Sequence, residues 1–214
     1  MKRHEHEGGR ERKKEKGRRS GGRERGQKRR EKYARILDYL PYGHSDNSRA
    51  VYQRKPLAQA IGEVTLVLME LSPKSEKSDK IPAVYERVYI GEGEREVIDH
   101  VVKRLNYDEL TPTAKLELPF LLERLVKEDE VKFIRAFNEA RSITTRLHTL
   151  DLLPGIGKKL MWAILEERKK GAFSDFDDLT RRVKGLHHPE KIIARRIEEE
   201  IKYENTKYKL FMRH

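Results

Sequence analysis

The predicted fold depends on one stretch of sequence, Leu152-Leu153-Pro154-Gly155-Ile156-Gly157-Lys158-Lys159-Leu160. We expect an apolar helical segment to run into this stretch and an amphipathic helix, residues 158–170, to run out of it. Proline and glycine between them predict a tight turn that joins the two helices. Gly155 and Gly157 have no Cβ, so the turn can adopt positive φ and a bulky partner can approach its backbone N–H groups closely.

An anionic partner is expected at this turn. Its amides lie at the start of a helix, where unpaired N–H groups and the positive end of the helix dipole favour a phosphate. Lys158 and Lys159 add two mobile positive charges, and Ile156 can point inward to hold the turn. The alternative is a purely structural corner, in which the glycines serve only the sharp change of chain direction.

The residues after this turn predict a second unit of the same kind. Apolar residues follow at helical spacing, and Gly171 comes directly after three basic residues, as at a helix C-terminus. Ser174 is expected to cap a short helix, residues 184–186 to form a second turn, and Pro189 to open a last helix. Residues 145–202 therefore predict two hairpins joined by a connecting helix.

Residues 152–186 read LLPGIGKKLMWAILEERKKGAFSDFDDLTRRVKGL. With the amphipathic helix after them, they resemble the tandem helix-hairpin-helix domain of DNA-repair, DNA-uptake and RNA-associated proteins. The resemblance implies binding of nucleic-acid backbone, without readout of sequence, through the amides of the glycine turn. The residues concerned are Gly155, Ile156, Gly157, Lys158 and Lys159. The second turn, with Lys184 and Gly185, departs from the pattern because His187 replaces a glycine and Pro189 has no amide N–H.

The positive charge of the chain is concentrated at its N-terminus. The net charge is +12 over 214 residues, and residues 1–32 hold 15 Lys and Arg against 6 Glu. Without aliphatic or aromatic residues after Met1, this segment cannot fold alone, and we expect a disordered basic arm. It resembles arginine-glycine segments that follow phosphate backbones, whose binding is salt-dependent. The arginines expected to contact phosphate are Arg18, Arg19, Arg23 and Arg25. The alternative is a tail that only solvates the protein.

The composition also indicates a compartment. The chain has no cysteine, which excludes disulfides, thiol catalysis and thiolate metal sites and fits a reducing interior. No apolar run approaches the length of a membrane span, and the N-terminus has no signal-peptide pattern. We expect a cytoplasmic protein with no membrane partner.

Residues 33–93 predict a small β-barrel of the OB type. Three runs read as strands, residues 33–42, 60–71 and 84–91, with a polar loop at 72–80. Gly62 is expected to form a bulge at a bend. Tyrosines interleaved with basic residues predict a surface on which bases stack, although half of the tyrosines are expected in the barrel core or rim. The basic residues of this surface are Arg35, Arg49, Arg54, Lys55 and Arg87.

Residues 94–142 predict a helical bridge between two modules. We expect helices at residues 94–105, from Thr111-Pro112 onward with a kink at Pro119, and at 130–141. The fold class is multidomain α+β, with an OB-like barrel, this bridge and an all-α tandem helix-hairpin-helix domain. We expect the tandem helix-hairpin-helix domain at residues 143–204 and a C-terminal tail at residues 205–214.

The span from Tyr33 to Phe211 resembles an archaeal family of uncharacterised, predicted RNA-binding proteins. The resemblance is carried, in this order, by YGHSDNS, AIGEVTLVLMELSP, YERVYIG, LNYDELTPTAKLELP and LPGIGKK. It implies nucleic-acid binding and no established reaction. Because the basic arm resembles the extensions of ribosomal proteins, we expect a non-catalytic protein that binds structured RNA, with ribosomal RNA and the ribosome as favoured partners. DNA binding in repair or chromosome maintenance is the main alternative. A nuclease or an accessory factor of RNA modification is a further one.

Catalytic motifs are weak in this sequence. His44-Ser45-Asp46 and Asp99-His100 are too close along the chain to form a relay, and the eight histidines show no metal-ligand spacing. There is no Walker-type loop, and Gly91-Glu92-Gly93-Glu94 is too acidic to hold a phosphate. We therefore expect no catalysis, no metal, no cofactor and no small-molecule substrate.

Overall fold

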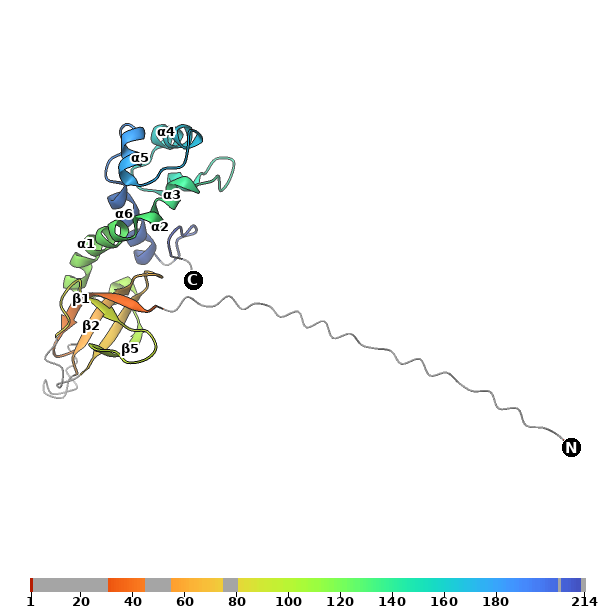
Figure 1. Ribbon diagram of the computed structural model, residues 1–214. Coiled ribbons are helices and arrows are strands. Elements are labelled where there is room, and N and C mark those ends of the chain that lie inside the picture. Colours follow the sequence, from red (N-terminus) through yellow and green to blue (C-terminus); the bar gives the residue numbers. More distant parts are fainter. Residues whose placement is uncertain (2–30, 45–54, 75–80, 204, 213–214) are drawn as a thin grey trace.

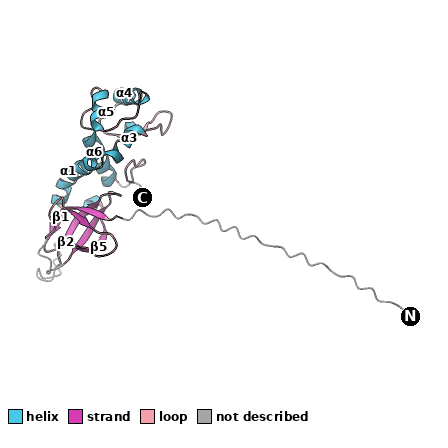
Figure 2. Cartoon of the chain, in the orientation of Figure 1, coloured by secondary structure: helices cyan, strands magenta, loops and turns pink. Residues whose placement is uncertain are grey.

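A sheet and a group of helices occupy opposite ends of the molecule (Figure 1 and Figure 2). The computed structural model describes residue 1 and residues 31–44, 55–74, 81–203 and 205–212. The sheet is a curled, antiparallel half-barrel with the strand order β4-β1-β2-β3-β5. Its strands are β1 (Tyr33–Leu40), β2 (Leu57–Gly62), β3 (Leu68–Pro73), β4 (Arg87–Tyr89) and β5 (Ile98–Arg104).

The sheet begins at Tyr33 as predicted, but the fold includes two residues before it, and irregular pairing helps the sheet to curl. Glu31 accepts hydrogen bonds from Val64 and Thr65, and the Lys32 carbonyl accepts one from Ile90 (2.8 Å), so these two residues belong to the fold rather than to the arm. The β1–β2 register shifts between Ile36 and Asp38, a position at which a bulge increases twist.

Two strand predictions need correction in the centre of the sheet. Residues 60–71 form a hairpin instead of one strand, because the chain turns at Leu66 with a φ of 57°. The sequence does not mark this turn, because Leu66 is itself apolar and buried and does not interrupt the hydrophobic run. Gly62 is the last residue of β2, and the bulge predicted there lies on β1 instead.

The predicted helix at residues 94–105 is wrong. Residues 98–104 form β5, an edge strand that pairs only with β3 in the described sheet. Val97 and Ile98 are buried, but Val101 and Val102 are exposed, so the apparent helical stripe does not lie on one face. Adjacent β-branched residues favour extended backbone, and here this preference outweighs the helical spacing.

Helix α1 (Pro112–Glu128) starts where predicted and continues through Pro119. Its N-cap, Thr111, accepts a hydrogen bond from the Ala114 N–H at 3.0 Å. The predicted helix at 130–141 is two single turns, α2 (Glu130–Phe133) and α3 (Arg135–Asn138). Nothing in the structure explains the break. A short 3-10 helix, η2 (Tyr107–Glu109), precedes α1.

The C-terminal half contains α4 (Lys158–Lys169), α5 (Phe176–Arg182) and α6 (Pro189–Lys202). The segment before the first glycine turn is a 3-10 helix of four residues, η3 (Thr149–Leu152), and not the predicted longer helix. The cap of α5 is Asp175, whose carboxylate accepts the Asp178 N–H at 2.6 Å, and not Ser174. No helix among the described residues is long and apolar enough to cross a membrane.

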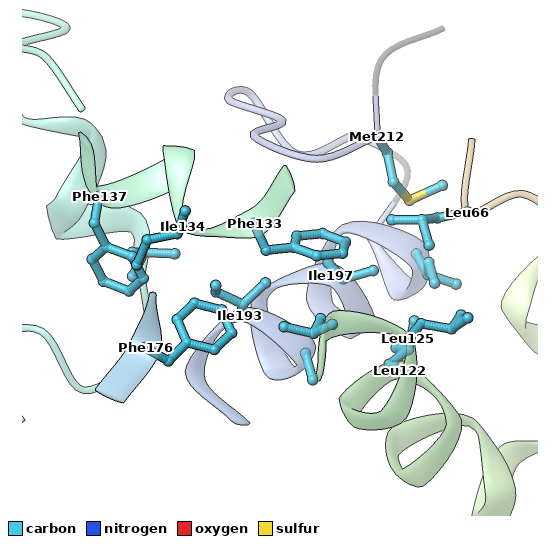
Figure 3. Packing of buried hydrophobic residues seen from close by; sticks show 14 of the residues in the cluster. Leu66, Leu122, Leu125, Phe133, Ile134, Phe137, Phe176, Ile193, Ile197 and Met212 are labelled. Carbon is cyan, nitrogen blue, oxygen red and sulfur yellow. The ribbon is translucent and has the colours of Figure 1, made fainter. Parts of the chain in front are cut away.

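One hydrophobic cluster joins the sheet to the helices. It runs from Leu37, Ile61 and Leu66 on the sheet through α1 to the C-terminal helices, where Phe133, Phe137 and α6 residues meet. Figure 3 shows Leu66 beside Leu125 and Met212. A second, smaller cluster lies within the sheet. The expected rigid bridge is therefore part of a shared core, and it does not separate two independent cores.

Polar contacts fix the start of α1 on the sheet. The Gln59 side chain, fully buried on β2, donates to the Glu109 carbonyl (3.0 Å) and accepts the Thr111 N–H (2.8 Å). The Thr111 hydroxyl donates to Asp38 on β1 at 2.6 Å. Each buried polar group is satisfied, so these contacts fix the direction in which α1 leaves the sheet.

A buried carboxylate holds the C-terminal tail against α6. Glu200 is 1% exposed and pairs with Arg196 at 3.0 Å. Its two oxygens also accept the backbone N–H groups of Leu210, Phe211 and Met212 at 2.7 to 3.1 Å. The Phe211 ring packs against that of Phe133 at a tilt of 54°, with a centroid distance of 5.8 Å. The tail is therefore part of the core.

Glu200→Ala should lower the free energy of unfolding by about 3 to 5 kcal/mol, because it leaves the Nε–H of the buried Arg196 and three backbone N–H groups without their acceptor. Glu198→Ala is the matched control, since on the same helix it removes only an ion pair with Lys202 and should cost less than about 1 kcal/mol. Chemical denaturation measures both losses. Equal losses would show that the tail does not depend on Glu200.

Candidate nucleic-acid interface

The first glycine turn is held by its apolar residues. Leu153 and Ile156 are buried, and the Ile156 N–H donates to the Leu153 carbonyl at 3.1 Å. Gly155 between them has a φ of 86°, which side chains rarely adopt. Gly157 has a φ of −82°, so the expectation of positive φ holds for Gly155 alone. Ile156 points inward, as predicted.

The outer side of this turn is open. A Cβ built on Gly155 or Gly157 would meet no atom within 4 Å. Gly157 is the N-cap of α4 and provides no capping side chain, and the first N–H to bond back along the helix is that of Met161, to the Gly157 carbonyl at 2.9 Å. The N–H groups of the first helical turn are therefore accessible to an anion, at the end where the helix dipole is positive.

The two lysines beside the turn differ in their contacts. Lys158 donates to the Asp151 carboxylate at 2.8 Å, although its side chain is largely exposed. Burial would raise the pKa of Asp151, but the hydrogen bonds from Lys158 and from the His148 amide hold it below its usual value. Lys159 is exposed and has no ion pair within the described part of the chain. Of the two lysines, Lys159 is therefore the one that can bind an anion without breaking an ion pair.

The second turn repeats the geometry of the first. Val183 and Leu186 are buried, the Leu186 N–H donates to the Val183 carbonyl at 3.2 Å, and Gly185 has a φ of 89°. The two turns differ after Leu186. Helix α4 begins three residues after Gly155, whereas α6 begins four residues after Gly185, and the residue before it, His188, has left-handed backbone conformation. The first residue of α6 is Pro189, which has no backbone N–H, so the second turn lacks one amide donor, as expected from the sequence.

The two turns lie next to each other. A Cβ built on Gly185 would lie 3.7 Å from Cδ2 of Leu160, which belongs to the first turn of α4. Both turns are at the end of the molecule that is distant from the sheet, where Figure 1 shows α4 and α5. Exposed basic side chains and imidazoles flank them: Lys158, Lys159, Lys184, His187, His188, Lys191 and Arg195. This set is the candidate interface.

Sequence reasoning missed some members of this interface. Lys191 and Arg195 lie on the exposed side of α6, three and seven residues after its N-cap. Arg146 is not in the set but adjoins it, because it is exposed and its carbonyl accepts a long hydrogen bond (3.5 Å) from Lys158. The i, i+4 spacing of the two α6 residues could have identified them, whereas the position of Arg146 depends on how the chain loops back to the turn.

The basic residues predicted on the barrel are not part of the candidate interface at the two turns. Arg35 is half-buried between the carboxylates of Glu63 (2.7 Å) and Glu128 (2.5 Å), and this geometry links β1 to α1. Burial would raise the pKa of Glu63, but Arg87 and Arg35 lower it. A phosphate contact by Arg35 would require displacement of both carboxylates. Lys55 is exposed and lies two residues before β2, and the other predicted basic residues lie outside the described residues: Arg18, Arg19, Arg23, Arg25, Arg49 and Arg54.

Several of the predicted stacking tyrosines have partners within the protein. The Tyr33 ring carries the Arg87 guanidinium at 3.5 Å and meets Tyr89 edge-on at 5.3 Å. The Tyr85 hydroxyl donates to Glu117, and burial together with this contact raises the pKa of Tyr85 to about 12. These three rings stabilise the sheet and its junction with α1, which leaves them little free face for a base.

Comparison with known proteins places the chain in a family. Residues 30–213 match the family described as DUF655, proteins of unknown function. The chain belongs to the DUF655 family. An uncharacterised protein of Methanocaldococcus jannaschii is 46% identical over 184 residues, covering 86% of this chain and 80% of the relative. A DUF655 crystal structure from Archaeoglobus fulgidus is 52% identical with a TM-score of 0.79, covering 86% of this chain and all of that chain. The family resemblance predicted from the sequence is thus confirmed as an archaeal family of uncharacterised proteins.

Stability near the first turn of this DUF655 protein should depend on pH. His148 caps η3 by accepting the Leu150 N–H at Nδ1 (3.2 Å). Burial, followed by the charge of Arg168, lowers the pKa of His148 below 6.5. The folded protein therefore binds this proton less well than the unfolded chain does. The stability contributed by neutral His148 is complete above pH 6.5 and is lost as the pH falls below that value through the lower pKa of the folded state.

His148→Asn should keep the cap and remove this dependence, because an amide oxygen accepts the same bond and does not titrate. Chemical denaturation between pH 7.5 and 5.5 compares the two proteins. We expect the wild type to lose more stability than the variant over this interval. Parallel curves would exclude His148 as the group responsible.

Proposed function

We propose that this DUF655 protein binds structured RNA through its phosphates, with the paired glycine turns as the contact. The observation that carries the proposal is the open first turn, where Gly157 leaves the N–H groups of α4 uncapped and Lys159 unpaired within the described chain. Uncapped helix N-termini with a glycine approach are suited to phosphate. The match of the second turn in φ and hydrogen bonding supports a tandem helix-hairpin-helix arrangement.

Two adjacent turns can hold two phosphates at a fixed separation. This arrangement selects a backbone of defined shape, as in a helical nucleic acid, and reads no bases. The contact at the second turn should be the weaker one, because Pro189 supplies no N–H and His187 occupies the position of a glycine. Lys191 and Arg195 can supply attraction there as side chains.

RNA is the favoured nucleic acid, and ribosomal RNA the favoured source. A basic arm on a small protein resembles the ribosomal proteins that extend such arms between RNA helices, and the half-barrel sheet is compatible with an OB-like module. DNA is the second candidate, since tandem helix-hairpin-helix domains frequently bind duplex DNA. Equilibrium binding to RNA and DNA hairpins of the same sequence, at one salt concentration, decides between them. Tighter binding of DNA would reverse the assignment.

We also propose that binding is not accompanied by catalysis. Within the described residues, the carboxylate nearest the first turn, Asp151, is engaged by Lys158 and by a backbone amide. Asp99 and His100 form an exposed pair on β5, and His44 contacts the buried Glu70. Neither pair adjoins the turns along the chain. Incubation of labelled RNA with Mg²⁺ and the protein should leave the RNA intact, and specific cleavage would reject this part of the proposal.

Gly157→Val should weaken RNA binding about tenfold or more, because its side chain occupies the side from which the phosphate approaches. Extended backbone at Gly157 tolerates valine, so the fold should lose no more than about 1 kcal/mol as an N-cap change. The change corresponds to loss of about 1.4 kcal/mol or more of binding free energy. Fluorescence anisotropy with a labelled RNA hairpin gives the affinity, and a thermal melt verifies folding.

Two variants control this experiment. Ala172→Val enlarges an exposed side chain beyond the other end of α4, at a residue without positive φ, and should leave binding unchanged. Lys158→Ala with Lys159→Ala should weaken binding less than Gly157→Val, since it removes screened charges and retains the amides. Collapse of binding in Gly185→Ala with survival in Gly157→Val would assign the contact to the second turn.

Deletion of residues 2–30 should leave the thermal melt unchanged and reduce both RNA affinity and its salt dependence. Each phosphate that the arm neutralises contributes roughly 0.7 to 0.9 to the slope of log affinity against log salt. Titrations at several salt concentrations measure that slope. An unchanged slope would show that the arm contacts no phosphate.

A further inference from the structure

The first turn is accompanied by an exposed aromatic ring. Trp162, the single tryptophan of the sequence, lies on α4 and is 60% exposed. Within the described part of the chain, its indole has no hydrogen bond, stacking ring or cation–π partner. The neighbouring residues Met161 and Ile164 are buried, so the helix is packed on its other side and the fold does not use the Trp162 ring.

The position of Trp162 relates it directly to the turn. It follows Lys158 and Lys159 by four and three residues, and all three are on the exposed side of α4. Side chains of an α-helix tilt toward its N-terminus, so the indole covers the turn that begins at Lys158. The Cα atoms of Trp162 and Lys158 are separated by about 6 Å along the helix axis. A single nucleic-acid strand can therefore contact both the uncapped amides and the ring.

Charge distinguishes this ring from the other strongly exposed aromatic side chain on a long helix. Phe120 on α1 is also 60% exposed, but its surroundings include Glu123 and Glu128 together with Arg124 and Lys127. The surroundings of Trp162 toward the turn are cationic. An aromatic face beside lysines and free N–H groups fits a nucleotide better than it fits an apolar protein surface.

We propose that Trp162 stacks on an unpaired base next to the phosphate held by the first turn, so that the target is an RNA helix interrupted by a bulge or ending in a single strand. In a continuous duplex, neighbouring bases cover both faces of each base, and no face is free for the indole. An unpaired base can leave the stack and offer its face. This inference rests on the proposed function and specifies the RNA that it requires.

The single tryptophan provides a direct measurement. The probes are a continuous RNA duplex and the same duplex with one bulged adenosine. With the bulged RNA, we expect quenching of the Trp162 fluorescence and protection from acrylamide, and with the continuous duplex little change in either. Trp162→Ala should bind the bulged RNA about 5- to 100-fold more weakly, the range for loss of one stacked base. Its affinity for the continuous duplex should stay unchanged, and Trp162→Phe should recover part of the loss.

Two further variants separate this inference from the proposed function. Phe120→Ala removes an equally exposed ring on α1 and should alter neither affinity. Gly157→Val should weaken binding of both RNAs. If Gly157→Val does so while Trp162→Ala loses nothing on the bulged RNA, phosphate binding stands and the stacking role is rejected. Unchanged fluorescence in the complex with bulged RNA also rejects it. If neither RNA binds the wild type, both proposals fail.

Discussion

The arrangement of this DUF655 protein depends on how α1 is held. Gln59 and Asp38 fix its first residues on the sheet, and its apolar face packs on both β1 and α6. Its last residue, Glu128, also contacts Arg35 on β1, and α6 packs along the helix, while Figure 1 shows α4 and α5 at the end of the molecule opposite the half-barrel. Because one core includes the sheet, α1 and the C-terminal helices, the two ends keep a fixed relation.

The distribution of charge fits this arrangement. In the folded part of the chain basic and acidic residues are nearly balanced, and many arginines are paired, as Arg35 is with Glu63 and Glu128 and Arg196 with Glu200. Attraction of a nucleic acid by the whole folded surface is therefore weak. Recognition would depend on the few places where amides and cations have no internal partner, together with the arm.

The sequence was informative where local chemistry determines the backbone. Pro-Gly and Lys-Gly with flanking apolar residues predicted both turns, and Thr111-Pro112 predicted the start of α1. It failed where tertiary pairing decides. The apolar spacing of residues 94–105 resembled a helix, but pairing with β3 makes the segment a strand. Arg35 looked available for phosphate because Glu128, its partner, is 93 residues away in the chain. Trp162 was not singled out from the sequence, because its exposure follows only from which side of the helix is packed.

The central claim is that backbone amides of the first turn hold an RNA phosphate, and nuclear magnetic resonance tests it most directly. The protein, labelled with ¹⁵N, is titrated with a short RNA hairpin while the amide resonances are followed. The account predicts that the largest shifts occur at Gly155, Gly157 and the first turn of α4, with a smaller one at Gly185, because the Ile156 and Leu186 N–H groups donate to carbonyls within their own turns. Shifts confined to the sheet, with the turn amides unmoved while RNA is bound, would contradict it.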